Sequence, residues 1–274
     1  MKSHVRRILV LCKTYPSPSA KYSETSCVAG MDESGQLIRL YPVPFRLIED
    51  NKRFKKWQWI SARLEKSSDQ RRESHKIFVD TIQCDKDTLP TSNHWQARRV
   101  WLDKLPVYDS FEALEAARQT DGVTLALLKP KRIAALEIRP VASPDWSEEE
   151  KDKLLKMQLQ GDLFSEDERK SITQLRKLPY DFYYRYECDT AHGPIEHTHK
   201  IVDWEIGALY WNTHRKHGQD WEKPFRAKLE DELPANDLMF LMGTIHRFPD
   251  QWLIVSLIYP PRQRPEPVLQ ESLF

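Results

Sequence analysis

Short segments rich in β-branched and aromatic residues follow one another through the first half of the chain, and they restrict its fold more than any other feature. Their ranges are Arg7–Cys12, Thr25–Met31, Gln36–Pro42, Gln58–Glu65 and Lys76–Cys84. Such residues favour pleated, half-buried strands. The peptide Asp32-Glu33-Ser34-Gly35 has the composition of a hairpin turn. The sequence therefore predicts a β-rich N-terminal half, either a small barrel or a PUA-like module.

The remaining periodicity predicts alternating helices and strands. Helical patterns cover Asn93–Asp103 and Ser110–Gln119, and strand patterns cover Val123–Leu128, Ile133–Val141, Tyr180–Cys188, His197–Val202, Asp237–Ile245 and Trp252–Tyr259. Asp203 is a plausible N-cap for a helix through His217 that ends at Gly218, and a second helix spans Trp221–Leu233. The order β-β-α-α-β-β predicts an antiparallel sheet with helices on one face, and an α+β fold for the chain.

Four ranges follow from these patterns. We expect a basic β-rich domain at 1–142, a helix and linker at 143–178, an α+β domain at 179–260 and an extended tail at 261–274. Ser147 followed by three glutamates indicates the start of the helix. Four prolines from Pro260 onwards indicate the extended tail.

Charge is distributed unevenly along the 274 residues. The formal net charge is only 42 − 41 = +1, but residues 1–76 carry 16 − 8 = +8. A local excess of this kind is typical of a surface that faces a polyanion, and ordinary solvated charge is the alternative. The apolar runs are too short for a membrane span, and four unpaired cysteines favour reduced thiols. We therefore expect a cytoplasmic protein with no membrane partner.

Two pentapeptides share a terminal Leu-Phe pair. They are Gln160-Gly161-Asp162-Leu163-Phe164 and Gln270-Glu271-Ser272-Leu273-Phe274. Both resemble the peptides by which polymerases and mismatch-repair proteins bind the bacterial sliding clamp. The resemblance implies that Leu163, Phe164, Leu273 and Phe274 fill an apolar groove while Gln160 and Gln270 fix the register. The alternatives are a helix end for the first peptide and a tail packed on the body for the second.

A third feature interleaves basic and aromatic residues. The stretch begins at Lys52 and continues to Lys76, and the residues predicted to bind DNA or RNA are Arg53, Lys55, Lys56, Trp57, Trp59, Arg71 and Arg72. The basic side chains would neutralise phosphates, and the tryptophans would stack on unpaired bases. The alternative is a strand that buries Trp57 and Trp59.

Two further peptides carry no motif that physical reasoning interprets. They are Lys13-Thr14-Tyr15-Pro16 and the run from Arg39 to Arg46. Both resemble an uncharacterised prokaryotic family linked to mobile elements or phage defence. The resemblance implies no assigned activity.

Metal-ligating residue types gather between Cys188 and Glu205. Cys188, His192, His197 and His199 would hold Zn²⁺, whereas Asp203 and Glu205 with His199 would hold Mg²⁺ or Mn²⁺ at a catalytic site. The alternative makes Asp203 a helix cap and the histidines polar loop residues.

Three functions stay open at this point. The first is a DNA-associated factor recruited to the sliding clamp in replication, repair or phage defence. The second is a metal-dependent nuclease that uses His199, Asp203 and Glu205. The third is a non-catalytic adaptor that links the clamp to another protein.

Overall fold

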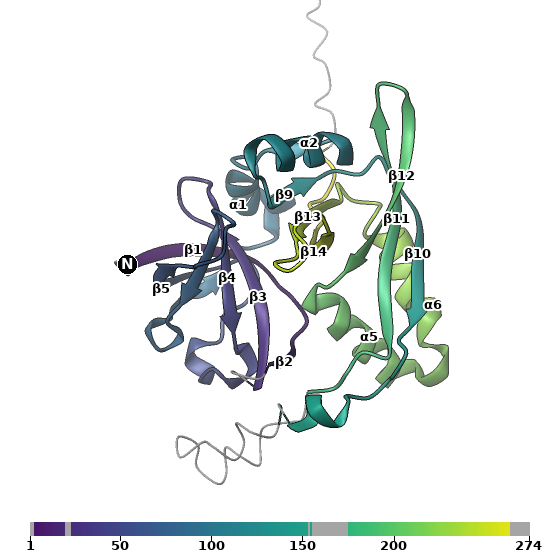
Figure 1. The fold of residues 1–274 in the computed structure, drawn as a ribbon. Helices are drawn as coiled ribbons and strands as arrows, with labels where there is room; N and C mark the ends of the chain where they lie inside the picture. Colours follow the sequence, from purple (N-terminus) through teal and green to yellow (C-terminus); the bar gives the residue numbers. More distant parts are fainter. Residues whose placement is uncertain (1–2, 20–22, 153, 155–174, 264–274) are drawn as a thin grey trace, which may run out of the picture.

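A computed structural model describes residues 3–19, 23–152, 154 and 175–263 (Figure 1). Both clamp-like peptides lie outside these residues. The described fold is α+β, as predicted, and it contains two sheets that pack against each other. None of the described helices is long and apolar enough to cross a membrane.

The first sheet occupies residues 4–88. In chain order its described strands are β1 (His4–Lys13), β2 (Ser17–Ser19), β3 (Ser23–Met31), β4 (Leu37–Val43), β5 (Gln58–Lys66), β6 (Ser74–Ile77) and β7 (Gln83–Thr88). The predicted turn joins β3 to β4, because the Asp32 carboxylate accepts the N–H groups of Ser34 and Gln36 and Gly35 adopts φ +89°. The single strand expected at 76–84 is divided into β6 and β7 by the 3-10 turn η3 (Val79–Thr81).

This sheet closes into a small barrel because β1 pairs on both of its sides. Its N-terminal half pairs with β5, and its C-terminal half pairs with β3. The barrel runs β1-β3-β4-β6-β5 and back to β1, with β4 and β6 parallel. Numbered in chain order without β2, the strands follow 1-2-3-5-4-1. This is the order of the OB fold, a five-stranded Greek-key barrel.

The barrel interior is apolar. Between β4 and β5 the chain forms the 3-10 turns η1 (Phe45–Leu47) and η2 (Asp50–Lys52). The buried interior side chains are Ile8, Val10, Val28, Ile38, Leu40, Val43, Phe45, Ile48, Phe54, Ile60, Ala62, Leu64, Ile77 and Ile82. Alternate residues of β1, β3 and β4 supply this interior, so the residues between them must face outward.

A helix and then the second sheet follow. Their described elements are α1 (Ser92–Leu102), β8 (Val107–Tyr108), α2 (Phe111–Asp121), β9 (Leu125–Leu128), β10 (Arg132–Pro140), β11 (Tyr180–Thr190), β12 (Gly193–Ile201), α5 (Trp204–His217), the 3-10 turn η4 (Gly218–Trp221), α6 (Glu222–Arg226), the π-helical turn η5 (Ala227–Glu232), β13 (Met239–Thr244) and β14 (Trp252–Ile258). The predicted order β-β-α-α-β-β is confirmed from β11 to β14. Strands β8 to β10 lie before residue 142 and belong to this second sheet rather than to the first.

The second sheet repeats the strand order of the first barrel. Strands β9 and β10 are separated only by residues 129–131. Together they take the place in the second sheet that β1 has in the first barrel. β9 pairs with β13, and β10 pairs with β11. The full order is β9/β10-β11-β12-β14-β13, with β12 and β14 parallel. The chain therefore contains two OB-ordered sheets.

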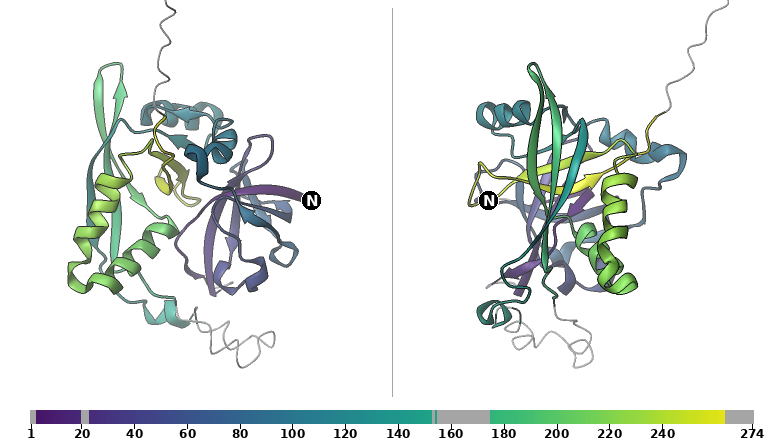
Figure 2. Two further views of the ribbon diagram at one scale, coloured as in Figure 1. Left: turned by 180° about the vertical axis from the view of Figure 1, so that it is seen from behind. Right: turned by 90° about the vertical axis from the view of Figure 1, so that its right-hand side faces the viewer.

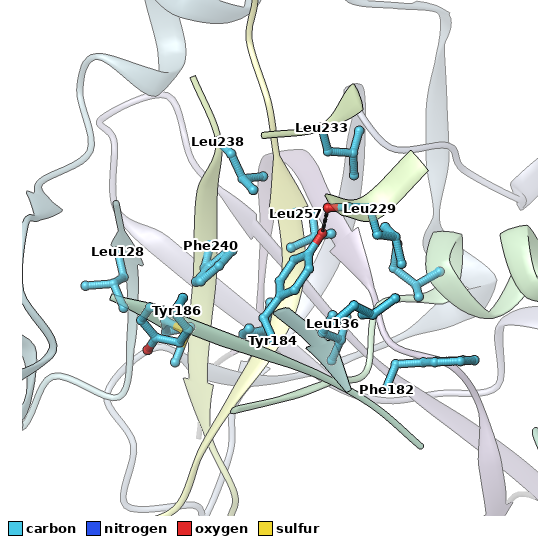
Figure 3. Close-up of a cluster of buried hydrophobic side chains, with 14 of the residues drawn as sticks. Leu128, Leu136, Phe182, Tyr184, Tyr186, Leu229, Leu233, Leu238, Phe240 and Leu257 are labelled. Carbon is cyan, nitrogen blue, oxygen red and sulfur yellow. Dashed lines mark hydrogen bonds between the residues drawn. The ribbon is translucent and has the colours of Figure 1, made fainter. Parts of the chain in front are cut away.

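Helix α5 stands where an OB fold places its helix, between the third and fourth strands of the second sheet. The Asp203 carboxylate accepts the Glu205 N–H at 2.8 Å, so the predicted N-cap is confirmed. Helices α5 and α6 complete a core that contains Phe182, Tyr184 and Phe240 (Figure 3). The Tyr184 hydroxyl donates a hydrogen bond to the Leu229 carbonyl in this core, at 2.6 Å (Figure 3).

The two sheets share an apolar interface. Figure 1 shows β13 and β14 between the first barrel and strands β10 to β12. The buried residues of this interface are Leu9, Leu11, Cys12, Ala29, Met31, Trp57, Trp59, Trp95, Leu102, Leu105, Leu125, Leu127, Met239, Leu241, Val255 and Ile258. They come from the outer faces of β1 and β3, from the start of β5, from α1 and the residues after it, and from β9, β13 and β14. The second sheet thus covers part of the barrel exterior.

Candidate nucleic-acid interface

OB folds bind their ligands on the outer face of strands 2 and 3 and on the loops beside it. In the first barrel those strands are β3 and β4, and the second sheet covers most of their outer face. Ala29 and Met31 of β3 lie in the interface with the second sheet. Arg39 of β4 crosses the same interface, where its guanidinium donates to the Thr124 and Thr244 carbonyls and pairs with Glu73 at 3.2 Å. The second sheet therefore covers the part of this face that Ala29, Met31 and Arg39 form, whereas Tyr41 of β4 stays 50% exposed.

The corresponding face of the second sheet, on β11 and β12, is open in the described part of the chain. The β11–β12 hairpin projects beyond the rest of the described fold (Figures 1 and 2). Tyr183 lies on this face, with the Arg139 guanidinium 4.1 Å from its ring centroid. The charged side chains form a ladder of ion pairs, which are Arg139–Glu137, Arg185–Glu137, Arg185–Glu196, Lys200–Asp181 and Arg132–Glu187. Because each cation faces a carboxylate, this face favours contacts to bases over contacts to phosphates.

The loop between β13 and β14 adds an exposed aromatic side chain. OB folds use the loop at this position to hold their ligands. Phe248 is 52% exposed and lies between the exposed residues Arg247 and Pro249. His246 beside it contacts Asp69 of the first barrel, with 3.3 Å between Nδ1 and Oδ2. An exposed aromatic ring beside cationic side chains is the arrangement that stacks on unpaired bases.

The basic and aromatic stretch predicted to bind nucleic acid divides between surface and interior. Lys55 and Arg72 are exposed. Arg53 is also exposed, and its guanidinium donates to the Ile48 and Arg46 carbonyls. Trp57 and Trp59 are only 3% and 6% exposed in the interface between the sheets.

Arg71 is half-buried and donates to the Thr244 carbonyl at 2.8 Å. These seven residues do not form one continuous surface, and their binding of nucleic acid stays a prediction.

Lys56 and the two predicted catalytic carboxylates lie at the junction of the sheets. The Lys56 ammonium is 2.9 Å from Glu205 Oε2 and 3.8 Å from Asp203 Oδ2, and it donates to the Leu257 carbonyl. Burial lowers the pKa of Lys56, but the two carboxylates raise it above its usual value. The buried Asp203 also accepts from the Ser256 hydroxyl and the Leu257 N–H. This cluster fixes the start of α5 to the first barrel.

The two peptides that carry no interpretable motif meet at this junction. The Lys13 ammonium lies 3.7 Å from the Phe45 ring centroid and 5.4 Å from that of Trp204. Tyr15 packs against α5 where Gly207 leaves room for its ring, and its hydroxyl accepts from the Trp211 indole. Burial lowers the pKa of Lys13 to about 8. No local pattern signals the packing of Tyr15 on α5, because these segments are nearly 200 residues apart.

The predicted histidine cluster lies at the α2 end of β12. His199 hydrogen-bonds to the Tyr186 hydroxyl at 2.9 Å and packs on Phe111, and burial lowers its pKa to about 4. His197 Nε2 is 3.1 Å from Glu112, and Cys188 is buried. His192 is exposed.

Among the described residues, no group of three or more His, Cys, Asp or Glu side chains is placed to hold a metal ion. His199 shares none of its described contacts with Asp203 or Glu205, so the structure does not bring this predicted catalytic set together. The Zn²⁺ and Mg²⁺ or Mn²⁺ sites stay predictions.

Fold and surface together define an α+β protein with two OB-ordered sheets. Among the residues that the structure describes, the ligand face is largely covered on the first sheet and open on the second. The chain belongs to the family of the domain of unknown function DUF8757, whose model matches residues 107–274. Residues 4–104 match a second domain of unknown function, DUF8758. The boundary between the matches falls between α1 and β8, where the second sheet begins.

Comparison with solved structures finds a chain of a replication protein A heterotrimer bound to single-stranded DNA, at 8% identity and a TM-score of 0.26. The match covers 94% of this chain and 65% of that chain, so this protein spans about two thirds of its length. At that TM-score the likeness says nothing about function. No curated protein matches this chain.

Proposed function

We propose that this protein binds single-stranded nucleic acid on the open face of its second sheet. One observation carries the proposal: Tyr183 on β11 and the exposed Phe248 occupy the strand face and the loop that OB folds use for ligands. Fold alone does not assign function, and the partly exposed Tyr183 and the exposed Phe248 supply the site-level argument. Each base stacked on an aromatic side chain contributes about 1–3 kcal/mol.

Fluorescence anisotropy with a labelled single-stranded DNA tests this proposal. We expect Phe248→Ala to weaken binding roughly 5–100-fold, because it removes one stacking surface. Tyr41→Ala is a matched control, since Tyr41 is 50% exposed on the first barrel. Equal weakening by both substitutions, or no binding by the unchanged protein, would contradict the proposal. Tighter binding of duplex than of single strands would contradict it as well.

We further propose that the two Leu-Phe peptides attach the protein to another protein. Their resemblance to clamp-binding peptides supports recruitment of the protein to the bacterial sliding clamp, with Leu273 and Phe274 in the apolar groove. If both peptides bind one ring, their linkers set the avidity. Recruitment of this kind would place single-strand binding at sites of replication, repair or phage defence.

A pull-down on purified clamp separates tethering from nucleic-acid binding. Replacing both Leu273 and Phe274 by alanine should abolish capture, or leave a residual that Leu163→Ala with Phe164→Ala removes. Ser272→Ala is the control within the same peptide. Capture that survives all four alanine substitutions would exclude these peptides as the tether. If the unchanged protein binds the clamp but no nucleic acid, the remaining function is that of a non-catalytic adaptor.

A further inference from the structure

A second, basic site adjoins the open face. A cavity of about 450 Å³ lies between α1, the junction of β9 with β10, and the segment before β13. Its lining includes five basic side chains, which are Arg99, Lys129, Lys131, Arg132 and Arg262. Asp237 is the one acidic residue among the described lining residues. None of these residues belongs to the basic stretch that the sequence indicated.

Three of the five cations already have carboxylate partners. Lys129 pairs with Asp237 at 2.7 Å, Lys131 with Asp189 at 2.7 Å, and Arg132 with Glu187. Ion pairs of this exposure contribute little to stability, but they fix the positions of the side chains. The other two cations of the cavity lining are Arg99 and Arg262.

Arg99 and Arg262 have no carboxylate partner in the described residues. The Arg99 guanidinium donates to the His94 and Pro261 carbonyls, and that of Arg262 donates to the Pro234 and Asn236 carbonyls. A guanidinium has more N–H donors than these bonds use. Both side chains are therefore held in place by neutral acceptors while their charges stay uncompensated, which suits bidentate binding of a phosphate.

The cavity lies at the edge of the face that carries Tyr183. Lys131 and Arg132 of its lining pair with Asp189 and Glu187 of β11. Glu187 is four residues from Tyr183 along the strand, which corresponds to about 13 Å. A strand whose bases stack on Tyr183 would therefore bring its backbone to the cavity. The ion-paired face lacks free cations for phosphates, and the cavity supplies them.

We infer that this cavity binds a phosphate group through Arg99 and Arg262, and that the phosphate belongs to the backbone of the nucleic acid on the open face. The inference rests on the proposed function for the identity of the ligand. The inference adds to that function a phosphate-binding site formed by Arg99 and Arg262. A free phosphate or a mononucleotide shares the same chemistry, and the experiment separates these sources.

The test compares the unchanged protein with an Arg99→Gln, Arg262→Gln double variant. Anisotropy with labelled single-stranded DNA is measured over a series of salt concentrations. Each phosphate contact contributes roughly 0.7 to the slope of log K against log salt for single strands. Both arginines hold the same phosphate, so the double variant loses one phosphate contact; binding should weaken roughly tenfold or more at low salt, and the slope should fall by about 0.7.

A second double variant, Arg215→Gln with Lys216→Gln, provides the control. These exposed residues end α5, and their loss changes the net charge equally. Thermal unfolding of each variant checks that the fold is intact. A third variant, Arg99→Lys with Arg262→Lys, keeps the charge but removes the bidentate geometry, and it should bind with intermediate affinity.

The outcomes separate this inference from the proposed function. If all variants bind single strands equally strongly and with equal salt dependence, the cavity does not bind the phosphate. That result would leave the proposed function unaffected. If the unchanged protein binds no nucleic acid, calorimetric titration with inorganic phosphate and with AMP shows whether the cavity binds a free phosphate group. Binding lost only in the Arg99, Arg262 variants would support a site for free phosphate, and absence of binding would overturn the inference.

Discussion

The two sheets have the same strand order but opposite surroundings. On strand 2, Met31 of the first barrel is fully buried against the second sheet, whereas Tyr183 of the second sheet is partly exposed. On strand 3, Arg39 is 4% exposed, whereas the Lys200 side chain is 35% exposed. The difference shows that strand order alone does not provide a ligand face. The first sheet packs most of this face against the second, and the second sheet keeps the surface on which we propose binding.

The largest contrast is expected at strand 3. Arg39→Ala should lower the free energy of unfolding by about 3–5 kcal/mol, because it removes the cation that pairs with the nearly buried Glu73 carboxylate and the guanidinium donor to the Thr124 carbonyl. Lys200→Ala removes only the exposed pair with Asp181 and should cost less than about 1 kcal/mol. Urea unfolding of both variants measures the difference. Similar losses would show that the two faces are equivalent.

The junction between the sheets should show the next largest effect. Asp203→Ala removes the α5 cap and the partners of Ser256 and Leu257, and we expect a loss of about 2–4 kcal/mol. Glu205→Gln, at a half-exposed side chain, should cost less than about 1 kcal/mol. Calorimetric unfolding distinguishes the two. A stable Asp203→Ala protein that has lost Mg²⁺-dependent cleavage of DNA would instead establish the nuclease.

Strand 2 provides a smaller contrast in packing. Met31→Ala should cost about 2–3 kcal/mol, since the unbranched side chain leaves a cavity that its neighbours fill only in part. Tyr183→Ala should cost less than about 1 kcal/mol, because its ring is partly exposed. Chemical denaturation gives both values. A larger loss at Tyr183 than at Met31 would reverse the assignment of covered and open faces.

The second sheet also has a pH dependence that comes from His199. Burial, with His197 nearby, lowers the pKa of His199 from 6.5 to about 4. The unfolded chain therefore takes up a proton between these values while the folded chain does not, so stability falls as the pH decreases from 6.5 to 4. The expected loss is about 2–3 kcal/mol. His199→Phe should abolish this part of the pH dependence. If the difference in free energy of unfolding between the variant and the unchanged protein is the same at every pH from 6.5 to 4, His199 does not cause the dependence.

The sequence allowed the element types to be predicted better than their assembly. Hydrophobic periodicity located the strands, and Asp203 and Gly218 marked the ends of α5. The apolar run from Ile8 to Cys12 is longer than a one-sided strand requires, and it is the signal that β1 is buried on both faces.

The contacts of the candidate sites depend on distant segments. Pairing of β4 with β6 closes the barrel, the ring of Phe45 meets Lys13, and Arg99 meets the carbonyl of Pro261. None of these contacts follows from local spacing. Phe248 was missed for another reason, since a single exposed aromatic residue in a loop has no pattern until the fold places that loop at a ligand face.

Photocrosslinking to single-stranded DNA that contains 5-iododeoxyuridine tests the central claim most directly. Mass spectrometry of the crosslinked peptides should identify Tyr183 and Phe248, and it should find no crosslink on β3 or β4. Crosslinks concentrated on the first barrel, with β11, β12 and the loop from 245 to 251 unmodified, would contradict the account.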